Sequence, residues 1–146
     1  MRVKKVLTIL FGSVILFLTS CGSIAPAFVR GTDIQWSIIE IRDDLSYDQA
    51  WASVIDVIAK KFEMEVISKD GAYGRTGWIY TWNPKNIYSA KYRTRVIFKF
   101  SADKRNVEVK TEAQIGGDKK WQSGFDTRLL ATIKQDIMGV VGRTTI

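Results

Sequence analysis

The chain has 146 residues, the length of one domain, and it carries 22 basic and 15 acidic side chains. It has no histidine, which excludes histidine-dependent triads and nearly every usual zinc or copper site, and its single cysteine excludes an intrachain disulfide. With 46% hydrophobic and 25% charged residues, the composition is that of an ordinary folded protein.

The first twenty residues have the layout of an export signal. Three cations, Arg2, Lys4 and Lys5, precede an apolar run from Val6 to Leu18. This run is shorter than the roughly 20 apolar residues that a membrane-spanning helix requires. We therefore expect a leader that is removed after export rather than a transmembrane anchor. A plain secretory signal followed by a chance cysteine is the alternative.

The segment Leu18-Thr19-Ser20-Cys21 resembles the lipobox of bacterial lipoproteins, in which small residues precede an obligatory cysteine. The resemblance implies cleavage before Cys21, a diacylglyceryl group on its sulfur and a third acyl chain on the new amino terminus. Two or more acyl chains hold a protein firmly on a bilayer. Gly22 in the following position implies, by the same resemblance, the outer membrane.

These features divide the chain into a leader over 1–20, a lipidated tether over 21–33 and a single domain over 34–146. The tether contains Pro26 and two glycines and shows no periodicity. Without its leader the chain keeps 19 basic and 15 acidic side chains, a net charge of +4. Much of the precursor's positive charge therefore belongs to the leader.

The first half of the domain predicts a strand and a helix. Residues 34–42 are rich in β-branched side chains, which favours a strand. Ser46 and Gln49 form a capping box that predicts a helix over 47–62. One face of this helix carries the apolar stripe Trp51, Val54, Ile55, Ile58 and Phe62.

Four strands and a second helix are expected after residue 62. The strands are predicted over 63–69, 72–82, 90–101 and 107–115, with a loop over 116–120. Ser123 with Asp126 can cap a helix whose buried side carries Leu129, Leu130, Ile133, Ile137 and Val140, and which Gly139 and Gly142 loosen or end. The order β-α-β-β-β-β-α predicts an α+β domain in which two helices pack on one face of a four- to five-stranded antiparallel sheet.

The segment from Ala50-Trp51 to Lys69-Asp70 and Gly74 resembles the helix-grip repeats of lipoprotein C of the β-barrel assembly machinery. The shared features are the "AW" at the helix start, the aliphatic stripe, the "FxxxV" strand entry and the "KDxxxG" turn. The resemblance covers about half of the mature chain, with one such unit in place of two. It implies a helix-grip-like fold and a scaffolding or accessory role in the envelope, with no catalytic residues.

A basic stripe is the main candidate for contact with an anionic ligand. Lys91, Arg93, Arg95 and Lys99 share one face of a predicted strand, and the neighbouring strand can pair Arg95 with Glu112 and Lys99 with Glu108. A solvated, ion-paired face is favoured, and contact with a lipid headgroup or a glycan is the alternative. Nucleic acid is not expected, because export removes the protein from it. The candidate contact residues are Lys91, Arg93 and Arg95, with Tyr88 and Trp121 in loops.

Three aromatic residues, Trp78, Tyr80 and Trp82, alternate along one predicted strand and therefore share a face. Packing in the core under a helix is favoured for them. The alternative is a solvent-facing platform on which a sugar or a peptide stacks.

No constellation of residues indicates catalysis. Glu63 with Glu65 could act as an acid–base pair and Ser68 beside Lys69 as a Ser-Lys pair, but neither has a supporting group. Gly71, Gly74 and Gly77 lack the spacing of a phosphate-binding loop. We therefore expect no enzyme, no cofactor and no metal.

The sequence as a whole predicts an outer-membrane lipoprotein, anchored through Cys21 and facing the periplasm. Its expected role is non-catalytic binding or scaffolding of an envelope protein or glycan. A periplasmic carboxylate-dependent hydrolase is one alternative. A carrier of hydrophobic ligands is another, which would require a sizeable apolar cavity between sheet and helices.

Overall fold

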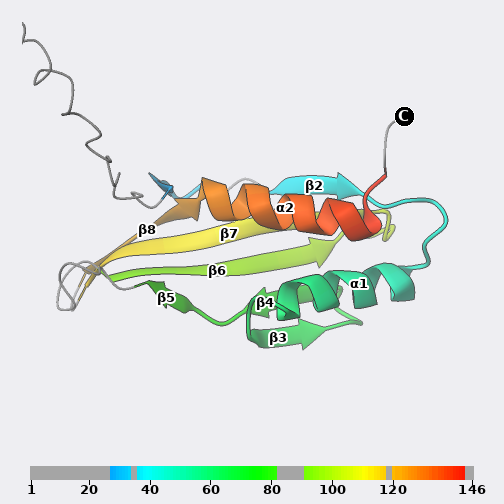
Figure 1. The fold of residues 1–146 in the computed structure, drawn as a ribbon, viewed down its shortest axis with the longest axis horizontal. Coiled ribbons are helices and arrows are strands. Elements are labelled where there is room, and N and C mark those ends of the chain that lie inside the picture. The colour runs from blue at the N-terminus through cyan, green and yellow to red at the C-terminus, as the bar shows by residue number, and fades with distance from the viewer. Residues whose placement is uncertain (1–26, 34–35, 82–90, 118–119, 144–146) are drawn as a thin grey trace, which may run out of the picture.

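The computed structural model describes residues 27–33, 36–81, 91–117 and 120–143. The leader, Cys21 and Tyr88 lie outside these ranges. The described residues form an α+β domain with an antiparallel sheet and two helices, as predicted (Figure 1). The elements in chain order are β1 (Phe28–Arg30), β2 (Ser37–Glu40), α1 (Tyr47–Ala59), β3 (Met64–Ser68), β4 (Tyr73–Thr76), β5 (Ile79–Thr81), β6 (Lys91–Phe100), β7 (Asn106–Gly117), β8 (Lys120–Asp126) and α2 (Thr127–Val141).

The sheet is built around the long hairpin of β6 and β7, which pair from Lys91–Gly116 to Phe100–Val107. The free edge of β7 pairs with β8 along one half and with β2 along the other. The free edge of β6 pairs in the same way with β4 and β5. Short β3 and β1 complete the sheet at its two margins. The described sheet therefore has eight strands, and the prediction of four to five was wrong.

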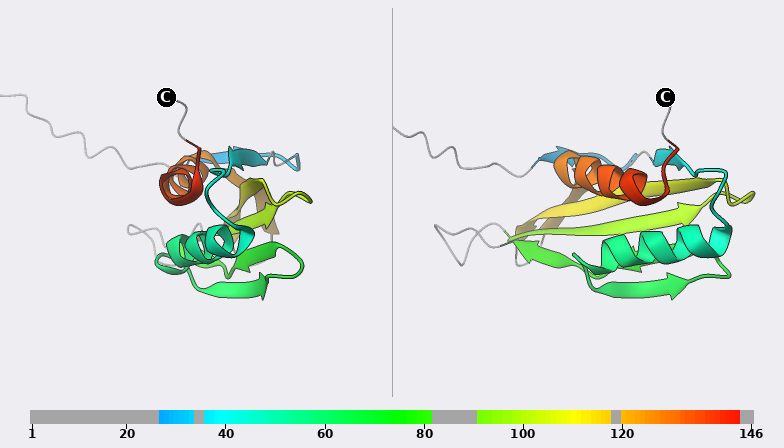
Figure 2. Two further views of the ribbon diagram at one scale, coloured as in Figure 1. Left: turned by 90° about the vertical axis from the view of Figure 1, so that its right-hand side faces the viewer. Right: turned by 45° about the vertical axis from the view of Figure 1, so that its right-hand side comes forward.

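Both helices pack on one face of the sheet, as Figure 2 shows in its left panel, where α1 and α2 lie on the same side of the strands. Alternate residues of β6 and β7 point toward the helices and are buried, from Tyr92 to Phe100 and from Val107 to Ala113. They meet the predicted stripe of α1 and the buried side of α2. The fully buried side chains include Val54, Ile58, Val96, Phe98, Val107, Val109, Ile133, Ile137 and Val141.

The start of α1 follows the sequence closely. The Ser46 side chain accepts a hydrogen bond from the Gln49 amide, and the Gln49 side chain accepts one from the Ser46 amide. These two reciprocal hydrogen bonds satisfy two backbone N–H groups that have no acceptor within the helix. The helix ends at Ala59, three residues before the predicted end, and the amides of Lys61 and Phe62 bond to the Ile58 carbonyl.

The start of α2 differs from the prediction, because residues 120–126 are a strand rather than part of a loop and a cap. Asp126 is the N-cap, and its carboxylate accepts from the Leu129 amide at 2.8 Å. Ser123 lies within β8 and does not cap the helix. The sequence of β8 contains Gly124 and Ser123 and lacks a clear alternation of apolar residues, so its periodicity was weak.

The first strand extends the sheet into the segment predicted as tether. Residues 28–30 pair with 124–126, and this close approach depends on Gly124, where a Cβ would collide with the Val29 carbonyl oxygen. A strand of three residues is too short to show a period in the sequence.

The predicted strand over 72–82 is interrupted between β4 and β5. At the break, the Thr76 hydroxyl accepts from the Val96 amide at 2.9 Å and donates to the Gly77 carbonyl at 3.0 Å. The side chain thus satisfies a β6 amide at the point where the β4 backbone leaves the ladder. Gly74 lies on the helix side of β4, where a Cβ would collide with the Phe98 ring.

Candidate functional site

The face of the sheet turned away from both helices, here called the outer face, carries three of the five candidate contact residues, Arg93, Arg95 and Trp121. Its members come from the other set of alternate positions on β6 and β7 and from neighbouring strands. They include four aromatic residues and several cations, and they are Trp36, Trp78, Tyr80, Arg93, Arg95, Lys99, Glu108, Lys110, Glu112, Gln114 and Trp121.

At one end of the outer face a single guanidinium is enclosed by aromatic rings. The central carbon of Arg93 lies 4.5 Å from the Trp78 ring centroid and 4.3 Å from that of Trp121. Arg93 donates to the Tyr80 hydroxyl at 2.9 Å and, through Nε at 2.7 Å, to the Gln114 side-chain oxygen. We call these five residues the Arg93 cluster. The electron-rich ring faces stabilise the positive charge of the guanidinium, which is the role that a carboxylate has in an ion pair.

The middle of the outer face is a network of ion pairs between β6 and β7. Arg95 and Glu112 lie 2.6 Å apart and Lys99 and Glu108 lie 3.1 Å apart, so both predicted pairs are confirmed. Arg95 also lies 4.4 Å from the Trp78 ring centroid, which links the network to the Arg93 cluster. Opposite charges facing each other across antiparallel strands stabilise the pairing of those strands.

The other end of the outer face has a second stacked ring. Trp36 lies directly before β2, and the Lys99 and Lys110 ammonium groups lie 4.7 Å and 4.8 Å from its centroid. Next to it on β2, Ile38 pairs with Glu108 and is 62% exposed. Ile38 therefore adds exposed apolar area beside the Trp36 ring.

The structure brings together three of the five residues proposed from the sequence as ligand or partner contacts. Arg93, Arg95 and Trp121 lie side by side on the outer face, although Trp121 is in β8 rather than in a loop. Lys91 pairs with Gly116 through its backbone, and its side chain lies outside the described part of the chain, as does all of Tyr88.

The prediction that Trp78 and Tyr80 pack in the core was wrong. Tyr80 pairs with Arg93 across β5 and β6, which places it on the outer face, and it is 46% exposed. Alternation along a strand shows which residues share a face but not which face is covered. Trp82 lies outside the described residues. Trp36 was missed altogether, because it lies before a short edge strand.

The residues considered for catalysis have other partners. Glu65 pairs with Arg75 at 3.1 Å across β3 and β4, and Lys69 pairs with Asp48 at 2.9 Å. The Ser68 hydroxyl accepts from the Gly71 amide at 3.2 Å and so closes the turn after β3. In the described ranges, no three histidine, cysteine, aspartate or glutamate side chains converge as a metal site would require.

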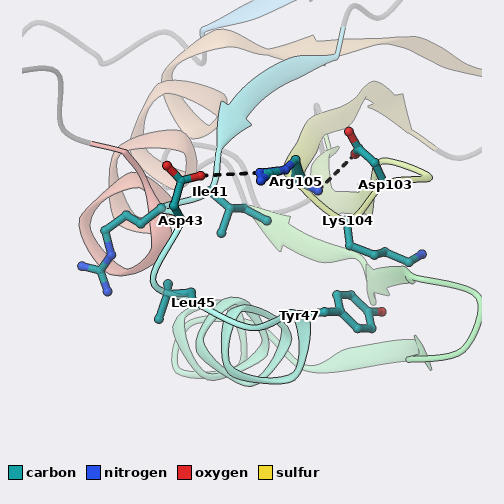
Figure 3. Close-up of a pocket in the computed structure, with 8 residues that line it drawn as sticks. Ile41, Asp43, Leu45, Tyr47, Asp103, Lys104 and Arg105 are labelled. Atoms are coloured by element: carbon teal, nitrogen blue, oxygen red, sulfur yellow. Dashed lines mark hydrogen bonds and ion pairs between the residues drawn. The ribbon is translucent and has the colours of Figure 1, made fainter.

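A hollow of about 260 Å³ lies at the end of the domain opposite the Arg93 cluster (Figure 3). Its rim is charged: Asp43 and Arg105 lie 3.5 Å apart, and the Lys104 ammonium lies 5.2 Å from the Tyr47 ring centroid. The cavity expected of a hydrophobic carrier would lie between sheet and helices and be apolar. This hollow has neither property.

One buried polar pair joins the sheet to α2. The Tyr92 hydroxyl donates to the Asp126 carboxylate, and the Thr111 hydroxyl donates to the Asp126 carbonyl at 2.9 Å. Burial, and next the hydrogen bond to Asp126, raise the pKa of Tyr92 far above its ordinary value of 10.0. Since Asp126 also caps α2, this pair has a structural role.

No protein-family model matches the sequence, and no curated protein matches it. Neither described helix is long and apolar enough to cross a membrane.

Proposed function

We propose that this protein is a bacterial envelope lipoprotein, anchored to the outer membrane through lipid on Cys21, whose domain faces the periplasm. Its role is to bind or brace an envelope protein or glycan without catalysis, and the outer face is the binding surface. The lipobox-like segment and the leader support the anchor. One observation carries the binding role: two helices cover one face of the sheet, while the other face presents stacked rings and cations.

The composition of the outer face fits this role. Tryptophan, tyrosine and arginine are enriched among the residues that contribute most to binding at interfaces. Here the rings of Trp78 and Trp121 are already held by Arg93, and Ile38 presents apolar area at the far end. The surface is therefore preorganised before a partner arrives.

The anchor is tested on protein isolated from bacteria that are fed a labelled fatty acid. We expect the label in the wild-type chain and a mature amino-terminal peptide that begins with acylated Cys21. The matched Cys21→Ser variant should keep the leader and lose the label. A bare thiol at residue 21, or an intact leader in the mature protein, would contradict the anchor.

The binding surface is tested by photo-crosslinking in cells. A photoreactive side chain is placed at Ile38, on the outer face, and in a matched chain at Gln135, which is exposed on α2. We expect position 38 to capture one defined envelope protein or glycan that position 135 does not. Equal capture from both positions, or a product only from 135, would refute the assignment of the outer face.

A further inference from the structure

The end of the sheet that holds the Arg93 cluster is basic, and its described cations have no carboxylate partner within the described ranges. Arg93 donates to Gln114 and Tyr80, and the Arg30 guanidinium donates to the Gln122 side chain. Lys120 begins β8 at the same end and is exposed. Figure 1 shows β5, β7 and β8 converging there, at the left of the view. We call this part of the domain the basic end.

The opposite end of the domain has a different electrostatic character. Its arginines are paired with carboxylates: Arg42 with Asp44, Arg105 with Asp43, and Arg143 with both Glu40 and Asp43. The arginines of this end are therefore paired with carboxylates, whereas Arg30 and Arg93 at the basic end donate, among the described residues, only to neutral groups.

Arg93 retains capacity for an anion. A guanidinium has five N–H donors. The three described hydrogen bonds use one donor each on Nε, Nη1 and Nη2, so one N–H remains on each terminal nitrogen. These two remaining N–H groups can donate charge-assisted hydrogen bonds to the oxygens of a phosphate.

The aromatic residues of the basic end suit the surface of a bilayer. Trp121 and Tyr80 flank Arg93, with ring centroids 6.5 Å apart, and Tyr80 is largely exposed. Tryptophan and tyrosine concentrate at membrane–water interfaces, where the ring contacts acyl chains and the polar group stays hydrated.

The proposed anchor keeps the basic end within reach of the membrane. The described domain begins at Ala27, six residues after Cys21, and a fully extended segment of that length spans about 20 Å. The Ala27 carbonyl accepts from the Thr127 amide, and the chain leads from there back along β8 to Trp121, roughly 20 Å at the rise of a strand. The segment is therefore long enough for the basic end to touch the bilayer.

We propose that the basic end docks on the anionic phospholipid headgroups of the bilayer that holds the Cys21 lipid, with Arg93 donating to a headgroup phosphate. This inference rests on the proposed lipid anchor. Docking fixes the orientation of the domain, so that the Trp36 end of the outer face points away from the membrane toward a partner.

The test uses the mature, lipidated protein reconstituted into vesicles of phosphatidylcholine with or without phosphatidylglycerol, with brominated lipid as a quencher of tryptophan fluorescence. We expect stronger quenching in the anionic vesicles, and we expect salt to reduce it. Arg93→Gln should weaken the salt-sensitive docking about fivefold, because one cation near an anionic surface is lost. Trp121→Phe should remove most of the quenched signal.

Arg105→Gln removes one cation at the opposite end and is the matched control, which should leave quenching unchanged. Unfolding curves of both variants show whether the fold is intact. Equal quenching in neutral and anionic vesicles, or equal effects of Arg93→Gln and Arg105→Gln, would overturn the docking. So would binding of the basic end to a polysaccharide without any lipid-dependent quenching. Mass spectrometry of the same sample reports the acyl chains, so a missing anchor is distinguished from a failure to dock.

Discussion

The two faces of the β6–β7 hairpin are formed by alternate residues of the same two strands, yet they differ in burial, polarity and charge. Facing the helices, Val96, Phe98 and Val107 are completely buried. Facing outward, Arg95 pairs with Glu112 and Lys99 with Glu108, and both cations also stack on tryptophan rings. The inner face holds the fold together through apolar burial, whereas the outer face is held by ion pairs and by contacts between cations and rings.

The largest effect is expected from breaking the inner face. Phe98→Ala removes a fully buried ring that contacts Trp51 and Phe100, and should lower the free energy of unfolding by about 4 kcal/mol. Lys99→Ala changes the next residue, on the outer face, and should cost less than about 1 kcal/mol. Urea unfolding measures both. Equal losses would show that the faces do not differ as described.

The second largest loss of stability is expected from the buried polar pair of Tyr92 and Asp126, which joins the inner face to α2. Asp126→Ala removes the N-cap, worth about 1 kcal/mol, and leaves the buried Tyr92 hydroxyl without its acceptor, which adds about 1–3 kcal/mol. Asp126→Asn keeps an acceptor and a good cap, so thermal unfolding should show a much smaller loss. If the two variants unfold alike, the hydrogen bonds of Asp126 do not stabilise the domain.

The same pair of residues predicts that the domain loses stability in alkaline solution. Burial and Asp126 hold the pKa of Tyr92 far above the ordinary 10.0 that it has in the unfolded chain. The folded state therefore keeps a proton that the unfolded state releases above pH 10, so its stability is full below that pH and falls as the pH rises further. Tyr92→Phe should reduce this slope. A residual slope is expected from Tyr47, whose pKa is raised chiefly by burial. An unchanged slope would contradict the role of Tyr92.

The smallest effect is expected within the outer face. Arg95 and Glu112 are 19% and 22% exposed, and a double-mutant cycle should give a coupling of about 0.5–1 kcal/mol. The exposed pair of Arg42 and Asp44 should give a coupling near the bottom of that range or below it. A coupling above that of an ordinary surface pair would mean that the outer face contributes to the fold as the inner face does.

Sequence reasoning succeeded where a pattern repeats over many residues. The stripe of α1, its Ser46 cap and the alternation along β6 and β7 each repeat or reinforce a signal, and the structure confirms them. It failed for β1 and β8, because three residues, or seven with Gly124 among them, carry little periodicity.

The candidate site was predicted in part. Arg93 and Arg95 were found because they alternate on a long strand, and their pairing with β7 followed from the hairpin. Trp78 and Tyr80 were placed on the wrong face, since their face depends on how β5 pairs with β6, a contact distant in sequence. The Arg93 cluster draws on β5, β6, β7 and β8 and on the connection between β4 and β5, and no local pattern in the sequence encodes the meeting of these segments.

The most direct test of the outer face as the binding surface is hydroxyl-radical footprinting of the protein in intact envelopes and in purified form. Tyr80 on the outer face and Met138 on α2 are both 46% exposed, so each serves as the other's reference. Lipid docking at the basic end would by itself protect Tyr80 and Trp121, so Trp36 at the other end of the outer face is the residue that reports a partner. We expect oxidation of Trp36 to fall in the envelope together with that of Tyr80, while oxidation of Met138 stays as it is in the purified protein. Equal labelling of Trp36 in both states, or protection of Met138 alone, would contradict the account.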